Sequence, residues 1–349
     1  MSVIEVNNLT KRYGNHTAVS NLSFSIEEGQ IYGFLGPNGA GKSTTMNIMT
    51  GCLAATSGEV KIGGYDIYED GDQAKQLIGY LPEQPPLYLD RTPREYLLFV
   101  ARAKGIPTRE LETQISHVMK ITGITDVSER LIKNLSKGYK QRVGIAQALL
   151  GDPKVIILDE PTVGLDPKQI IEIRELITSL GKKHTVILSS HILSEVQSVC
   201  QTILIISKGK LVACDTPENL EKLFAGTTTV ELTAEMDETG AVDILKGIEG
   251  ISIVETKQLV NGRCFVKLET DADDSVCREI FFAFARAEKA IIRMTNASAS
   301  LEDIFIELTS ADPTAEDASS GAADEGESEE YTEEERDEAL ESEEEVDAQ

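Results

Sequence analysis

Residues 36–43 read Gly36-Pro37-Asn38-Gly39-Ala40-Gly41-Lys42-Ser43. It fits the pattern G-x-x-x-x-G-K-[ST], in which glycines let the backbone turn its N–H groups toward a phosphate. Lys42 would reach the β- and γ-phosphates of a nucleotide, and the Ser43 hydroxyl would bind Mg2+. An apolar run at 30–35 and helical spacing over 42–50 flank the stretch, so a phosphate site is favoured over an ordinary glycine-rich turn.

A buried strand is predicted at residues 155–158, Val-Ile-Ile-Leu, and two acids, Asp159 and Glu160, follow it directly. Ligands of open α/β sheets bind at the carboxyl ends of the strands. At that edge Asp159 could hold Mg2+ and Glu160 could polarise an attacking water molecule. By itself the segment would more readily fit a strand that ends in two solvated acids. Because the same chain also has a glycine-rich phosphate loop, the catalytic interpretation of Asp159 and Glu160 is favoured.

The first 225 residues alternate between strand and helix patterns, which predicts an α/β domain with a largely parallel sheet covered on both faces. Between residues 88 and 150 the pattern is mostly helical, so we expect a helical insert there, with one helix starting at Pro93. Strands are expected at 3–6, 17–26, 30–35, 59–62, 77–81, 155–158, 185–188 and 202–206, and further helices at 42–50, near 111–121 and from Pro167.

A second domain is predicted at residues 226–310, where the pattern β-α-β-β-α-β fits a small ferredoxin-like α+β unit followed by a short helix. Its simplest role is to stabilise a dimer without binding a ligand. Residues 311–349 hold 18 acidic residues and one basic residue, so this segment cannot bury enough apolar surface to fold. We expect it to be a disordered acidic tail. The strands are expected at 229–232, 251–254, 264–268 and 290–294, and the helices at 242–248 and 275–287.

Composition excludes several classes of protein. The net charge of −26 argues against a partner that is a nucleic acid, because phosphate contacts need clustered lysine and arginine. No apolar run approaches the ~20 residues that cross a bilayer, and the first residues lack the pattern of a signal peptide. The five cysteines are widely spaced and form no CxxC pair, so neither a zinc site nor a disulfide framework is indicated. We therefore expect a reduced, cytoplasmic protein.

Together with further short motifs in the same order, residues 1–225 resemble the nucleotide-binding subunit of ATP-binding cassette (ABC) transporters, a P-loop NTPase fold. The motifs are Tyr13 as the aromatic residue that stacks on adenine, Gln84 in the glutamine loop, a signature Leu-Ser-Lys-Gly-Tyr at 135–139, a loop Gly-Leu-Asp-Pro at 164–167, and the switch histidine His191. The cofactors implied are ATP and Mg2+. The residues implied for nucleotide binding are Tyr13, Gly36, Pro37, Asn38, Gly39, Ala40, Gly41, Lys42, Ser43, Thr44, Ser136 and Gly138; those for Mg2+ are Ser43, Gln84 and Asp159; those for catalysis are Glu160, His191 and Gln84.

The signature departs from the family's usual Leu-Ser-Gly-Gly-Gln, because Lys137 replaces the first glycine and Tyr139 replaces the glutamine. Ser136 and Gly138 remain, and Ser136 is expected to cap the helix at 137–150 and to aim its hydroxyl at a γ-phosphate. Lys137 would add positive charge near that phosphate. The departure therefore bears on rate and affinity rather than on the role of the signature.

Simpler interpretations of single residues stay open. Tyr13 could be a surface residue that only packs, and Gln84 could be a plain loop residue. Ser136 could be only a helix cap, and His191 could be a helix-start residue without chemistry. The histidines that fit no motif are taken as structural: His16, His117 and His184.

The family mechanism implies partners. Two copies would pair head to tail, with each ATP held between the glycine loop of one copy and the signature of the other. The glutamine loop and the helical insert would face an integral membrane permease. The segment Ser-Leu-Glu-Asp-Ile-Phe-Ile-Glu-Leu at 300–308 resembles the C-terminal extension of exporter-type subunits of drug, antibiotic and gliding-motility systems.

The expected function is therefore an ATPase subunit, peripheral at the cytoplasmic face of the membrane, that powers export. One alternative is a soluble ATPase of the same superfamily that acts on ribosomes or DNA, but the chain has no second cassette, long coiled coil or zinc insertion. The other alternative is a non-hydrolytic regulatory subunit, against which the intact Asp159, Glu160 and His191 argue.

Overall fold

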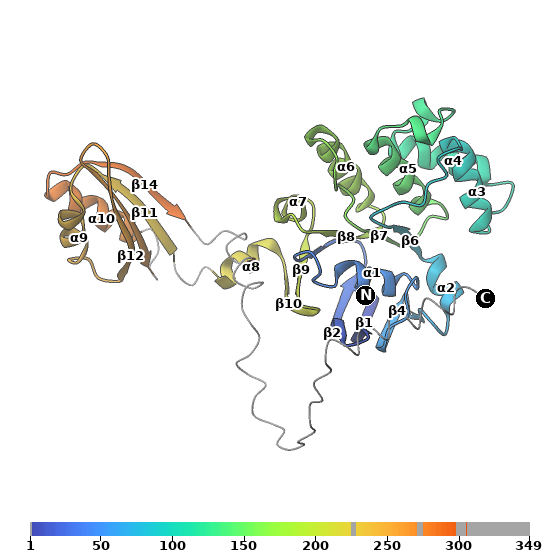
Figure 1. The fold of residues 1–349 in the computed structure, drawn as a ribbon, viewed down its shortest axis with the longest axis horizontal. Helices are drawn as coiled ribbons and strands as arrows, with labels where there is room; N and C mark the ends of the chain where they lie inside the picture. The colour runs from blue at the N-terminus through green and yellow to red at the C-terminus, as the bar shows by residue number, and fades with distance from the viewer. Residues whose placement is uncertain (1, 225–227, 271–274, 298–304, 306–349) are drawn as a thin grey trace, which may run out of the picture. The chain divides into compact units, whose positions relative to one another are not determined.

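The computed structural model describes residues 2–224, 228–270, 275–297 and 305. A six-stranded sheet in the order β10-β9-β3-β8-β7-β6 forms its centre (Figure 1). The five strands from β9 to β6 run parallel, and β10 pairs antiparallel at the edge. The strands are β3 (Ile31–Leu35), β6 (Ile78–Leu81), β7 (Val155–Leu158), β8 (Thr185–Ser190), β9 (Thr202–Ser207) and β10 (Lys210–Asp215).

A second, antiparallel sheet corrects the expectation of one largely parallel sheet. The segments expected at 3–6, 17–26 and 59–62 pair with each other and not with the central strands. The reason is local, because Tyr13 pairs with His16 across a two-residue turn that includes Gly14, and strands joined by such a turn must be antiparallel. The sheet has the order β2-β1-β4-β5, with β1 (Ser2–Tyr13), β2 (His16–Glu27), β4 (Ser57–Ile62) and β5 (Tyr65–Asp66).

The two faces of the six-stranded sheet are covered in different ways. Ile156 and Leu158 belong to one buried apolar cluster with the helices of the chain segment between β6 and β9. Val155 and Ile157, which alternate with them, belong to a second cluster with α1 and the antiparallel sheet. Figure 1 shows α1 between the two sheets and α3 to α6 on the opposite side.

Helices connect the strands of this region. The capping box of Thr92 and Glu95 starts α3 at Pro93, as the sequence predicts. No helix of the described residues is long and apolar enough to span a bilayer. The helices are α1 (Lys42–Met49), α2 (Gly71–Gln76), α3 (Pro93–Ala103), α4 (Leu111–Thr122), α5 (Lys137–Leu149), α6 (Pro167–Leu180), α7 (Leu193–Gln197) and α8 (Pro217–Phe224), with 3-10 turns η1 (Thr125–Val127) and η2 (Ile132–Asn134).

The last described part of the chain builds an antiparallel sheet of its own, in the order β12-β13-β11-β14. Both of its helices contribute to one buried cluster with the strands, through residues such as Leu245 and Phe284. The first helix starts earlier than expected because Asp237 caps it, accepting from the N–H of Gly240. The short final helix and the acidic tail lie outside the described residues. The elements are β11 (Thr228–Ala234), α9 (Glu238–Leu245), β12 (Ile251–Leu259), β13 (Arg263–Thr270), α10 (Ser275–Arg286) and β14 (Ile291–Ala297).

Candidate nucleotide site

The glycine loop joins β3 to α1, as the sequence predicts. Gly41 precedes the helix with φ 102°, a left-handed conformation that side chains disfavour. A Cβ at this position would also lie 2.5 Å from the carbonyl oxygen of Ala18, so only glycine fits. The loop therefore delivers the first N–H groups of α1, and the positive end of its dipole, to one side of a cleft.

Lys42 begins α1 and is almost fully buried, with 5% of its surface exposed. Its ammonium donates to the carbonyl oxygens of Gly36 at 2.8 Å and Pro37 at 3.3 Å. It also lies 3.6 Å from Oε1 of Glu160, whose side chain is equally buried. A buried charge is tolerated only when it is paired and hydrogen-bonded, and these three contacts meet that need.

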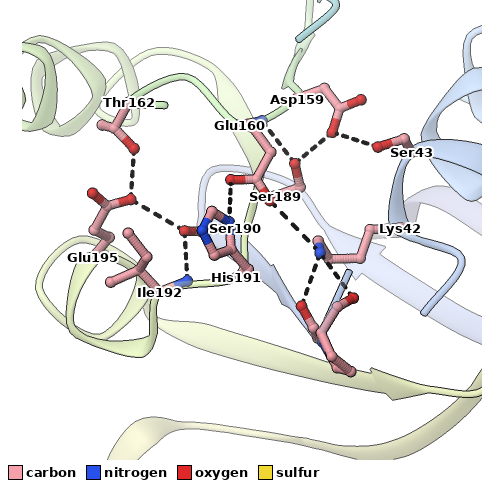
Figure 2. Close-up of polar contacts among 12 residues, drawn as sticks. Lys42, Ser43, Asp159, Glu160, Thr162, Ser189, Ser190, His191, Ile192 and Glu195 are labelled. Carbon is pink, nitrogen blue, oxygen red and sulfur yellow. Dashed lines mark hydrogen bonds and ion pairs between the residues drawn. The ribbon is translucent and has the colours of Figure 1, made fainter. Parts of the chain in front are cut away.

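Ser43 and Asp159 come together from α1 and the end of β7. The Ser43 hydroxyl donates to Oδ1 of Asp159 at 3.1 Å, and the Ser189 hydroxyl donates to the same oxygen at 2.6 Å (Figure 2). Hydroxyl and carboxylate oxygens are the ligands that Mg2+ prefers. No group of three or more His, Cys, Asp or Glu side chains in the described part of the chain could hold a metal unaided. The donor set therefore fits Mg2+ that is shared with phosphate oxygens.

The phenol of Tyr80 interacts electrostatically with Asp159. Tyr80, on β6, donates from its hydroxyl to Oδ1 of Asn47 at 3.0 Å. Burial, and to a lesser degree the charge of Asp159, raise the pKa of Tyr80 above its usual range. Tyr80 therefore stays neutral at any working pH and serves to hold α1 against β6.

Glu160 follows Asp159 and holds an uncommon backbone conformation, with φ 48°. Its N–H donates to the Ser189 hydroxyl at 2.8 Å, which helps to fix that conformation. Its Oε2 lies 3.0 Å from Nδ1 of His191, which follows β8. A buried carboxylate held between an ammonium and an imidazole is suited to accept a proton from a water molecule.

These side chains open onto a cleft of about 600 Å3. Its wall includes most of the predicted residues: Tyr13, Asn38, Gly39, Ala40, Gly41, Lys42, Ser43, Thr44, Glu160 and His191. Gly36, Pro37 and Asp159 lie behind this wall and act on it through their bonds to Lys42 and Ser43. The sequence did not indicate four further residues of the wall: His16, Ala18, Glu83 and Val163. The two-residue turn that places His16 opposite Tyr13 was the available signal for His16.

The glutamine loop reaches the cleft through a residue other than the expected one. Glu83 lines the wall, whereas Gln84 is exposed outside it. Both lie in a bend of the chain that follows the end of β6. The metal and catalytic roles that the sequence predicted for Gln84 stay predictions. Glu83 adds a carboxylate to this wall.

The signature lies at a different place. Ser136 caps α5, accepting from the N–H of Tyr139 at 3.3 Å, so the predicted cap is present. Ser136 and Gly138 line a hollow of about 340 Å3 together with Arg142 and Lys168, not the cleft of Lys42. A Cβ on Gly138 would lie 2.7 Å from the side chain of Gln169, which shows how closely α6 approaches.

The two unusual signature residues make contacts inside the chain. A Cβ on Gly164 would lie 2.1 Å from the Lys137 ammonium nitrogen, so this charge sits against the loop that leads to α6. The Tyr139 hydroxyl donates to Oδ2 of Asp126 at 2.9 Å, and this bond raises the pKa of Tyr139. Both residues therefore tie the start of α5 to its neighbours.

Known proteins share these features. A model of the ABC transporter family matches residues 19–163. The chain is 35% identical to the bacitracin transport ATP-binding protein BcrA of Bacillus licheniformis, over 88% of this chain and 97% of BcrA. It is 37% identical to the linearmycin resistance ATP-binding protein LnrL of Bacillus subtilis, over 66% of this chain and 75% of LnrL. The solved dimer of the ATP-binding cassette MJ0796, in a post-hydrolysis state with ADP and Pi, matches with TM-score 0.56 and 26% identity, over 61% and 98% of the two chains.

Proposed function

Since the chain belongs to the ATP-binding proteins of the ABC transporter family, we propose that its ATP hydrolysis powers export through a separate membrane permease. ATP binding and hydrolysis follow from the family and from the hydrolysis-state structure that the chain resembles. The names of BcrA and LnrL, for transport of one antibiotic and resistance to another, support export as the direction.

One observation carries the proposal: charged groups from three separate strand ends converge on one phosphate loop. Lys42 follows β3, Asp159 and Glu160 follow β7, and His191 follows β8. Parallel strands bring their carboxyl ends to one edge, which is why residues more than a hundred positions apart meet there. This arrangement suits the transfer of a phosphoryl group to water.

In the proposed reaction, Lys42 binds the β- and γ-phosphates and Glu160 accepts the proton of the attacking water. His191, 3.0 Å from Oε2 of Glu160, orients the carboxylate and contacts the γ-phosphate side of the cleft. Mg2+ would be held by Ser43 and Asp159 and would neutralise charge on the phosphate oxygens. Tyr13, on the wall of the cleft, would stack on the base, and the Lys11 ammonium lies 5.0 Å from its ring centre.

We assign to Glu83 a further role on the wall of the cleft, in addition to the roles predicted for Gln84. A carboxylate there would face the same cleft as Ser43 and Glu160. It would attract a divalent cation more strongly than an amide does, because it adds negative charge to an oxygen ligand. Gln84 remains the residue proposed for Mg2+ and catalysis in this loop.

Two partners belong to the proposal. The separation of Ser136 from the cleft of Lys42 supports a head-to-tail pair of chains, in which the signature of one copy completes the cleft of the other. An exposed aromatic surface on the helical insert supports docking of a permease at the cytoplasmic face of a membrane. There Tyr88 packs against Phe99 with ring centres 5.2 Å apart, and Phe99 is 52% exposed.

The proposed domains are 1–225 for the ATPase, 226–310 for a ferredoxin-like accessory unit, and 311–349 for the acidic tail. The strand order β12-β13-β11-β14 supports the ferredoxin-like assignment, because it places the first and third strands of the unit at the centre of the sheet. Stabilising the dimer remains the role proposed for this unit.

Phosphate release by the full chain with ATP and Mg2+, alone and with its permease, tests the proposed function. We expect activity in the wild-type chain and none in Lys42→Ala, which loses the ammonium that meets the phosphates. Nucleotide binding without any phosphate release in the wild-type chain would instead favour the non-hydrolytic regulatory subunit.

A further inference from the structure

A buried carboxylate, that of Glu195, lies beside the cleft without lining it. Glu195 is in the first turn of α7 and is 6% exposed. Figure 2 shows it on the far side of His191 from Lys42. Burying a carboxylate is unfavourable unless hydrogen bonds or opposite charges compensate it. The groups that contact Glu195 therefore show which segments of the chain it connects.

Two hydroxyl groups donate to one oxygen of this carboxylate. Thr162 Oγ1 donates to Oε2 of Glu195 at 2.5 Å, and Ser190 Oγ donates to the same oxygen at 3.1 Å. The Ser190 hydroxyl also accepts from the N–H of Ile192 at 3.0 Å. The other carboxylate oxygen lies 4.0 Å from the guanidinium of Arg174, so the hydroxyl bonds are its closest contacts.

The two hydroxyls belong to the two segments that carry the catalytic pair. Thr162 is two residues after Glu160, and Ser190 directly precedes His191. The Glu195 carboxylate therefore bridges the chain after β7 to the last residue of β8, at the point where Glu160 Oε2 and His191 Nδ1 lie 3.0 Å apart. Glu160 needs such support, because its φ of 48° is an uncommon conformation for a residue with a side chain.

We propose that Glu195 is a positioning residue for hydrolysis: by holding Thr162 and Ser190, it fixes the distance between Glu160 and His191. This inference rests on the proposed function, in which that pair acts on the attacking water. It predicts that the bridge affects the chemical step and not nucleotide binding, because Glu195 and Thr162 do not line the cleft.

The sharpest variant is Thr162→Val, which removes the donating hydroxyl and keeps the shape of the side chain. We expect kcat to fall by about 10- to 100-fold, the size of effect that a small misplacement of catalytic groups has. The affinity for ATP should stay unchanged. Thr162→Ser keeps the hydroxyl and should recover most of the lost kcat, and Glu195→Gln, which can still accept from a hydroxyl, should lie between the two.

Ser198→Ala is the matched control. Its hydroxyl donates to the backbone oxygen of Glu195 at 2.9 Å, so the variant perturbs the same helix without touching the bridge. We expect wild-type kcat from it. Thermal unfolding of all variants separates misfolding from misplacement, and Glu195→Gln serves as the second probe if Thr162→Val does not fold.

A double variant distinguishes positioning from a general structural role. If the bridge acts through the Glu160–His191 pair, adding Thr162→Val to His191→Ala should lower kcat no further. Multiplied losses in the double variant, a loss of ATP affinity in Thr162→Val, or wild-type kcat in Thr162→Val would each overturn the inference. Absence of phosphate release from the wild-type chain would refute the proposed function itself, so the two failures are distinguishable.

Discussion

The cleft around Lys42 and the hollow around Ser136 differ in construction, although both are proposed to meet the same kind of phosphate. In the cleft, the ammonium of Lys42 and the carboxylate of Glu160 are buried and face each other at 3.6 Å. In the hollow, Ser136 is an exposed helix cap whose hydroxyl accepts one backbone bond. Charged side chains line both, but the cleft buries an ammonium beside a carboxylate, whereas the hollow presents an exposed helix start next to Arg142 and Lys168. In the proposed head-to-tail pair, each chain would thus contribute two unlike halves of a site.

The largest expected effect tests whether the two halves work across two copies. Lys42→Ala and Ser136→Ala should each abolish hydrolysis in pairs of identical chains. Mixing the two variants should restore about a quarter of the wild-type rate, because about half of random pairs are mixed and each of these has one intact site of two. Phosphate release measured against mixing ratio gives the answer, and no recovery at any ratio would show that both regions act within one chain.

Glu160→Gln should have the next largest effect and should be confined to the cleft. Loss of the negative charge should lower kcat by roughly 10²–10⁴-fold, the usual range for a positioned base. ATP should still bind through Lys42 and Ser43, so the variant should accumulate as an ATP-bound dimer in size-exclusion chromatography. Glu175→Gln, on the exposed side of α6, is the control. Near-normal turnover would remove Glu160 from the proposed role.

Alanine substitutions should lower the free energy of unfolding more at Gly41, in the cleft, than at Gly138, in the hollow. Gly41→Ala meets the backbone of Ala18 at 2.5 Å with φ 102°, so it should lower the free energy of unfolding by about 1–3 kcal/mol and weaken ATP binding. Gly138→Ala meets only the side chain of Gln169, which can move, and alanine favours the helix. Its change should stay below about 1 kcal/mol. Urea unfolding checks both, and equal losses would contradict the comparison.

The last prediction concerns Tyr139. Tyr139→Phe removes the bond to Asp126 and should lower the free energy of unfolding by about 1 kcal/mol. Because the pKa of Tyr139 is raised in the folded chain from its usual 10.0, the unfolded chain loses this proton first. The advantage of the wild type should therefore be complete below pH 10 and disappear as pH rises through the folded pKa. A difference between the two chains that is independent of pH up to 11 would contradict this assignment.

Residues at strand ends could be predicted from the sequence. The glycine loop, Asp159 and His191 each follow a short apolar run, and the sequence order of a parallel sheet sends such ends to one edge. The helix starts at Pro93 and Pro167 could be predicted in the same way, because proline is suited to the first helical position. In these cases the residues next to the strand end or the helix start are sufficient for the prediction.

The remaining features depend on neighbours that sequence order does not reveal. Whether Glu83 or Gln84 faces the cleft is decided by the course of a bend after β6, which the order of residue types does not reveal. The strand β10 was missed because none of its residues is fully buried, so its apolar pattern is weak. The contact of Glu195 with Thr162 could not be predicted either, since the two residues are 33 positions apart in the sequence.

The cap at Ser136 has a consequence for how fast two copies can engage. A hydroxyl has one proton to give and two lone pairs to receive with. Accepting the N–H of Tyr139 uses a lone pair and keeps the proton available for an anionic oxygen arriving from outside. The same bond holds the side chain in one rotamer before any encounter. In the proposed head-to-tail pair, the side chain of Ser136 would already hold its orientation when a nucleotide-loaded copy approaches, because the entropy of ordering it is lost when α5 folds.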